Sequence, residues 1–221
     1  MTRKSAGRGG NRRSAEAASR VALILRVAKR LFLHKGYANT SLNDIIGLAG
    51  GSKATLRKYF KDKAGLFSAV IADVSTNFVA GARLKDIVGA PEEVLRAFGE
   101  IVLGFYLANE SLAAYRGVVA EGVKSPAMAR SFYEQGHCLV QAALAERLAA
   151  WHRTGLVVSR NALDDADLFL HLIRAGIHEQ CLIGLRKSPG QQEIAARISS
   201  AVRIFLHGVG NRRPGGKASA T

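Results

Sequence analysis

The chain has 221 residues with a formal net charge of +15, and 48% of its residues are hydrophobic. This apolar content suffices for a core of ordinary size, which excludes a largely disordered protein. No run of about 18 uncharged apolar residues occurs, so no membrane span is expected. No apolar signal core follows the basic N-terminus, and export is not expected. The two cysteines fit neither zinc spacing nor a disulfide framework, which is typical of a reducing cytoplasm.

Most of the positive charge lies at one end of the chain. Residues 1–70 contain 15 lysines and arginines against 3 acidic residues, a net charge of +12, whereas the remainder carries +3. Such asymmetry indicates a nucleic acid or an anionic membrane as partner, with a mere solubility tail as the alternative. Residues 1–18 are rich in Gly, Ser and Arg and nearly devoid of apolar side chains. They are predicted to form a flexible basic arm.

Residues 19–67 show helical periodicity, with residues typical of helix starts and ends between the periodic segments. A first helix runs from Ser19 to a glycine suited to a left-handed cap, and two short helices follow, separated by the dipeptide at 50–51. In the second short helix Leu56 and Phe60 lie one turn apart and are predicted to pack inward. Two short helices joined by a glycine turn and supported by longer ones describe a helix-turn-helix. The predicted caps are Gly36, the capping box of Ser41 with Asp44, Ser52, and Asp62 for a fourth helix.

The rest of the chain is also patterned as helices, and no strand alternation is found. The predicted helices cover about 91–108, 111–123, 125–152, 165–186 and 190–207. The fold is therefore predicted to be all-α, with about nine helices in total. Residues 209–221 are predicted to be a disordered tail.

Two stretches resemble a known family. The run ILRVAKRLFLHKGY at 24–37, TSLNDIIGLAGGSKATLRKYF at 40–60 and KAGLF at 63–67 resemble the DNA-binding domain of the TetR family. AYRGVVAEG at 114–122 and SFYEQG at 131–136 resemble the AefR-like C-terminal domains of that family. The resemblance implies a helix-turn-helix domain at 19–67 and a larger helical ligand-binding and dimerisation domain at 68–208.

The resemblance also implies a set of DNA contacts, with the second short helix entering the major groove. Asn43, Lys53 and Thr55 are expected to reach base edges. The remaining candidates, mostly for phosphates, are Thr40, Ser41, Ser52, Arg57, Lys58, Tyr59 and Lys63. Thr40, Ser41 and Ser52 have helix capping as the alternative role, and Tyr59 has packing. Two positions depart from the family pattern: Arg57 replaces a tyrosine, and Gly51 replaces a valine, which is expected to loosen the recognition helix.

In the family, the last two long helices form the dimer interface and the middle helices enclose a ligand. The interface would here comprise 165–186 and 190–207, where Ala175, Gly176 and Gly184 permit close helix approach between or within subunits. The ligand-binding candidates are Phe105, Tyr106, Phe132, His137, Trp151, Phe169 and His171, each with core packing as the alternative. No HExxH motif or Cys/His cluster supports a metal for these histidines or His178.

The function predicted from these features is a cytoplasmic, homodimeric DNA-binding regulator. Repression of a palindromic operator, relieved by a small-molecule inducer, follows from the resemblance. The alternatives are a transcriptional activator or a non-specific nucleic-acid-binding protein. An enzyme is disfavoured because the chain has no GxSxG, no P-loop and no dinucleotide fingerprint after a strand, and no catalytic residue or cofactor is expected.

Overall fold

The computed structural model describes residues 8–83 and 86–207, and this part of the chain is helical without strands. The fold class predicted from the sequence is confirmed. The first residues of the predicted arm and the predicted tail at 209–221 lie outside the described residues. The chain divides into two compact units, residues 1–82 with 108–140 and residues 83–107 with 141–221. The first unit therefore extends beyond the predicted 19–67 domain.

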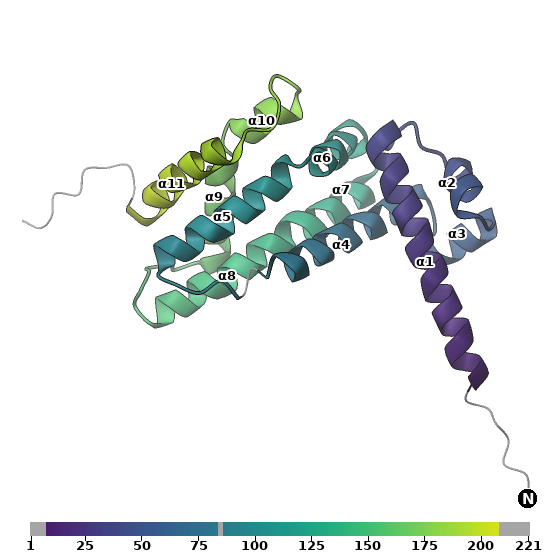
Figure 1. The fold of residues 1–221 in the computed structure, drawn as a ribbon, viewed down its shortest axis with the longest axis horizontal. Helices are drawn as coiled ribbons and strands as arrows, with labels where there is room; N and C mark the ends of the chain where they lie inside the picture. The colour runs from purple at the N-terminus through teal and green to yellow at the C-terminus, as the bar shows by residue number, and fades with distance from the viewer. Residues whose placement is uncertain (1–7, 84–85, 208–221) are drawn as a thin grey trace, which may run out of the picture. The chain divides into compact units, whose positions relative to one another are not determined.

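Helix α1, Arg8–Lys35, is longer than the sequence pattern predicts (Figure 1). The expectation of a flexible arm is wrong from Arg8 onward, because residues 8–18 continue the helix. Alanine, arginine and glutamate are good helix formers, and each residue added to an existing helix contributes one backbone hydrogen bond. The predicted end of the helix is confirmed, with Gly36 at a φ of 78°.

The helix-turn-helix head consists of α1 with α2 (Leu42–Ala49), α3 (Lys53–Phe60) and α4 (Lys63–Ala82). All three predicted N-terminal caps form: Ser41 and Asp44 make a capping box on α2, Ser52 caps α3, and Asp62 accepts from the Gly65 N–H at 2.7 Å. These bonds satisfy helix N–H groups that would otherwise lack a partner. The shared core of the head is formed by Ile24, Ala28, Phe32, Ile45, Leu56, Leu66 and Phe67.

Helix α4 is the one described helix long and apolar enough, by length and composition, to cross a membrane. Its residues Leu66, Phe67, Val70 and Ile71 are buried in the core of the head. Packing within the head accounts for the apolar composition of this helix.

The first unit is completed by α6 (Asn109–Glu121), α7 (Pro126–Phe132) and a π-helical turn, Tyr133–His137. Helix α4 packs against α7 and this turn. The π-helical turn is followed at once by α8 (Cys138–Arg153). The single helix predicted over 125–152 is thus present, but one wider turn interrupts its regular hydrogen bonding.

The second unit is built around α5 (Pro91–Leu107), which packs against α11 (Gln191–His207) and α9 (Ala162–Arg174) (Figure 1). The prediction of one helix over 165–186 is wrong, because α9 ends at Arg174 and α10 covers only Ile177–Leu182. Gly176 and Gly184 have φ values of 73° and 78°, which favour glycine and end helices. These glycines therefore shape turns in the described chain and do not lie inside a long helix.

Candidate nucleic-acid interface

Helix α3 has one buried and one exposed face. Leu56 and Phe60 are buried in the head core, as predicted. The polar residues around them are exposed or partly exposed: Lys53, Thr55, Arg57, Lys58 and Tyr59. The Lys58 ammonium lies 5.7 Å from the centre of the Tyr59 ring. The exposed face thus offers three cations and two hydroxyl groups, which are donors suited to phosphate oxygens and base edges.

The start of α2 lies in the same head and adds further polar groups. The Ser41 hydroxyl accepts from the Asp44 N–H at 3.1 Å, while Asp44 Oδ2 accepts from the Ser41 N–H at 2.9 Å. The Ser41 N–H and the Ser41 hydroxyl, which both donate to Asp44 Oδ2, hold the pKa of Asp44 below its ordinary value, and Lys35 adds to the effect. Ser41 and Asn43 are exposed. Both side chains are therefore accessible to a ligand while Ser41 also caps the helix.

Thr40 differs from its neighbour because its side chain is almost completely buried, with 1% exposed. Its hydroxyl donates to the carbonyl of Gly36 at 2.8 Å and lies 3.2 Å from the carbonyl of Leu31. Leu31 lies near the end of α1, and Gly36 directly follows the last residue of that helix. In the described structure Thr40 ties the end of α1 to the start of α2, which favours the structural alternative over a phosphate contact.

Lys63 opens α4 and is held by the segment between α1 and α2. Its ammonium donates to the carbonyl of Ala38 at 3.2 Å and lies 4.3 Å from the centre of the Tyr37 ring. Burial lowers the pKa of Lys63, and Glu121 opposes that effect. Tyr37 packs in turn against Phe32 and Phe67. Lys63 is thus fixed at the start of α4 by an aromatic group that the sequence analysis did not single out.

The ligand-binding candidates are divided between the two units. In the first, Phe132 packs against the head core and against Tyr115 at 5.5 Å, while the buried His137 stacks on Tyr133 at 5.2 Å. These surroundings favour packing for Phe132.

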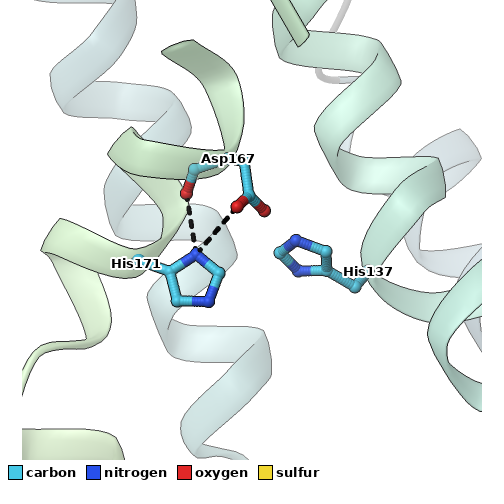
Figure 2. A group of neighbouring side chains, drawn as sticks. All are labelled: His137, Asp167 and His171. Carbon is cyan, nitrogen blue, oxygen red and sulfur yellow. Dashed lines mark hydrogen bonds and ion pairs between the residues drawn. The ribbon is translucent and has the colours of Figure 1, made fainter. Parts of the chain in front are cut away.

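In the second unit the candidates range from fully buried to exposed. Phe169 is a core residue in edge contact with Phe205 at 5.1 Å, and Trp151 is also buried. His171 is exposed, and Figure 2 shows its Nδ1 directed at both the carbonyl and the carboxylate of Asp167, at 2.9 and 3.5 Å. Phe169 is therefore best explained by packing, whereas His171 is accessible.

A second aromatic and basic group surrounds Tyr106 in the same unit. Phe105 and Tyr106 are partly exposed, the Arg174 guanidinium lies 5.1 Å from the centre of the Tyr106 ring, and His178 makes an edge contact with that ring at 6.3 Å. Burial, with Arg174 adding to it, lowers the pKa of His178 to about 4. This group therefore combines two flat rings with one fixed cation and a neutral histidine near pH 7.

A capped recognition helix with an exposed basic face, carried on a three-helix support, defines a helix-turn-helix DNA-binding protein. The particular family follows from two models: bacterial regulatory proteins of the TetR family match residues 24–70, and the AefR-like transcriptional repressor C-terminal domain matches residues 93–208. The chain belongs to the TetR family. Its class is that of DNA-binding transcription regulators and not of enzymes.

Individual relatives agree with this assignment. The chain is 26% identical over 192 residues to the HTH-type transcriptional regulator YvkB of Bacillus subtilis, which covers 84% of this chain and 95% of YvkB. A TetR-family regulator of Mesorhizobium loti has the same fold, with a TM-score of 0.76, 22% identity, and coverage of 86% of this chain and 96% of that one. The flavonoid-responsive regulator FrrA is similar with a TM-score of 0.68, 27% identity and the same coverage.

Proposed function

We propose that the protein is a homodimeric repressor that binds a palindromic operator and is released from it by a small-molecule inducer. The observation that carries the proposal is the exposed face of α3, where Lys53, Arg57 and Lys58 surround the two buried anchors of the helix. The protein would act in the cytoplasm, where its DNA target is.

The DNA side of the proposal divides the exposed residues by what they can reach. Lys53 and Thr55, at the start of α3, are proposed to read base edges together with Asn43 from α2. Ser41, Ser52, Arg57, Lys58, Tyr59 and Lys63 are proposed to hold backbone phosphates. Thr40 is left out of the contact set because its hydroxyl is used inside the head.

The dimer side rests on exposed apolar residues in the second unit. Leu168 on α9 is 62% exposed, and Ile183 and Leu185, which follow α10, are 68% and 72% exposed. Together with α11, these residues are proposed to form the interface between two copies of the chain. A dimer would place two recognition helices about one helical turn of DNA apart, roughly 34–36 Å, which requires a palindromic site.

The inducer is proposed to be a small aromatic molecule that contacts Phe105 and Tyr106 on α5. Stacking on these rings and an interaction with Arg174 would suit a planar molecule with acidic hydroxyl groups. The relative FrrA, named as flavonoid-responsive, supports the same chemical class. An inducer that prefers one conformer of the dimer would weaken operator binding by about 1–3 kcal/mol.

The DNA-binding part is tested by selecting sites from a random duplex pool with the purified protein, at low and at raised salt. Enrichment of a palindrome that survives raised salt would support the proposal. Retention of DNA without an enriched motif, lost at moderate salt, would contradict it in favour of non-specific phosphate binding.

The inducer part is tested with the single tryptophan of the chain, Trp151, which is buried in the second unit. Titration with a panel of flavonoids is expected to change its fluorescence and to release the selected DNA at the same concentrations. A panel that changes neither signal would contradict the proposed ligand class and leave the DNA-binding result unaffected.

A further inference from the structure

Arg20 of α1 lies directly over the turn of the helix-turn-helix. A Cβ atom built on Gly50 would be 3.5 Å from Arg20 Nη1, and one built on Gly51 would be 3.8 Å from the same atom. The two glycines adopt φ values of 71° and 100°, which other residues rarely adopt. The turn therefore has no side chains at these two positions, and the guanidinium group lies beside its backbone.

The guanidinium group is not neutralised within the described part of the head. Arg20 is exposed, and no acidic side chain among the described residues pairs with it. The turn is followed by Ser52 and Lys53, so the charged residue nearest to the turn in the sequence is also positive. Exposed, unpaired cations on this part of the head favour the binding of an anion there.

Arginine is well suited to such an anion when it is a phosphate. Its planar guanidinium group offers parallel N–H donors that match two phosphate oxygens, and it remains charged at all relevant pH values. The turn immediately precedes α3. When α3 enters the major groove, the Arg20 guanidinium beside the turn therefore comes close to the DNA backbone.

We propose that Arg20 is a DNA-binding residue that holds a backbone phosphate beside the start of the recognition helix. Gly50 and Gly51 leave room for its guanidinium group because they have no side chains. The contact adds a residue of α1 to the interface and rests on the placement of α3 in the proposed function. It also explains how the turn serves DNA binding although Gly51 contributes no side chain to the core.

The proposal is tested by measuring the affinity of full-length Arg20→Ala for a short duplex of random sequence, by fluorescence anisotropy over a series of salt concentrations. Loss of one phosphate contact lowers the slope of log K against log salt by about 0.9 for each head bound. We expect this decrease, together with an affinity loss of about tenfold at low salt, and partial recovery of the slope in Arg20→Lys.

Arg26→Ala is the matched control. Arg26 is exposed on the same helix, six residues after Arg20, and its replacement removes the same charge. Its slope should remain close to that of the wild type. Equal slopes for wild type and Arg20→Ala, or equal decreases in both variants, would overturn the proposal. A lower melting temperature with an unchanged slope would assign Arg20 a structural role instead. If the wild-type protein retained no DNA, the proposed function itself would fail.

Discussion

Replacing Thr40 with valine separates a structural role of its hydroxyl from a phosphate contact. The side chains have similar shapes, and the site is buried, so the main change is loss of the donor to the carbonyls of Gly36 and Leu31. A buried acceptor left without its donor costs about 1–3 kcal/mol. Because one hydroxyl proton serves both carbonyls, we expect a destabilisation near the middle of that range, about 2 kcal/mol.

The assay is thermal unfolding combined with DNA binding well below the transition. A loss of about 2 kcal/mol corresponds to a decrease in melting temperature of about 4–8 °C for a chain of this size. The affinity for the selected operator should stay within twofold of wild type. Ser41→Ala is the comparison variant, since Ser41 is exposed and should lose both cap stability and affinity. Thr40→Val with unchanged stability and a reduced salt slope would refute the structural role.

Four further substitutions test other parts of the molecule. A Cβ on Gly99 would lie 3.1 Å from two atoms of the buried Ile198, whereas one on Gly104 meets nothing within 4 Å. Gly104→Ala should therefore raise the free energy of unfolding, measured by chemical denaturation, by about 0.5–1 kcal/mol. The free energy of unfolding of Gly99→Ala should be about 1–3 kcal/mol lower than that of Gly104→Ala. The pKa of His178 is lowered to about 4 in the folded chain. The stability that depends on neutral His178 should therefore be fully present above pH 6.5 and be lost as the pH falls toward 4. After allowance for the partial exposure of the ring, this loss is about 1–2 kcal/mol. Measured by unfolding at several pH values, the free energy of unfolding of His178→Gln should vary less with pH over this range. Lys53→Ala should weaken operator binding by about 1–3 kcal/mol in titrations, and wild-type affinity would contradict the assignment of α3.

The local signals in the sequence were sufficient for the head. Caps depend on residues two or three positions apart, so Ser41, Asp44 and Ser52 could be assigned from spacing alone. The buried face of α3 was equally clear, because Leu56 and Phe60 are separated by one turn. These elements could be predicted because each is determined within a few residues of its own sequence.

Breaks inside long apolar patterns could not be predicted in the same way. The apolar residues on either side of Ala175 and Gly176 keep helical spacing, so the pattern reads as one helix although the chain turns at Gly176. Glycine within a helical pattern is compatible with continuation or with a turn, and the choice depends on packing against α5 and α11. The same limit applies to Thr40, whose burial depends on the position of α1 and not on neighbouring residues.

The charge of the head shows most directly how structure refines composition. The first 70 residues carry a net charge of +12, yet part of this charge is used within the first unit. Lys29 lies 3.6 Å from Glu110, Lys35 lies 3.8 Å from Asp44, and Lys63 donates to a backbone carbonyl. The exposed cations at or near the recognition helix in the described part of the head include Arg20, Lys53, Arg57, Lys58 and Lys61. Since the salt dependence of DNA binding counts neutralised phosphates, the slope for each head should follow the cations that reach phosphates, Lys63 of the proposed contacts included, and not the net charge of the segment.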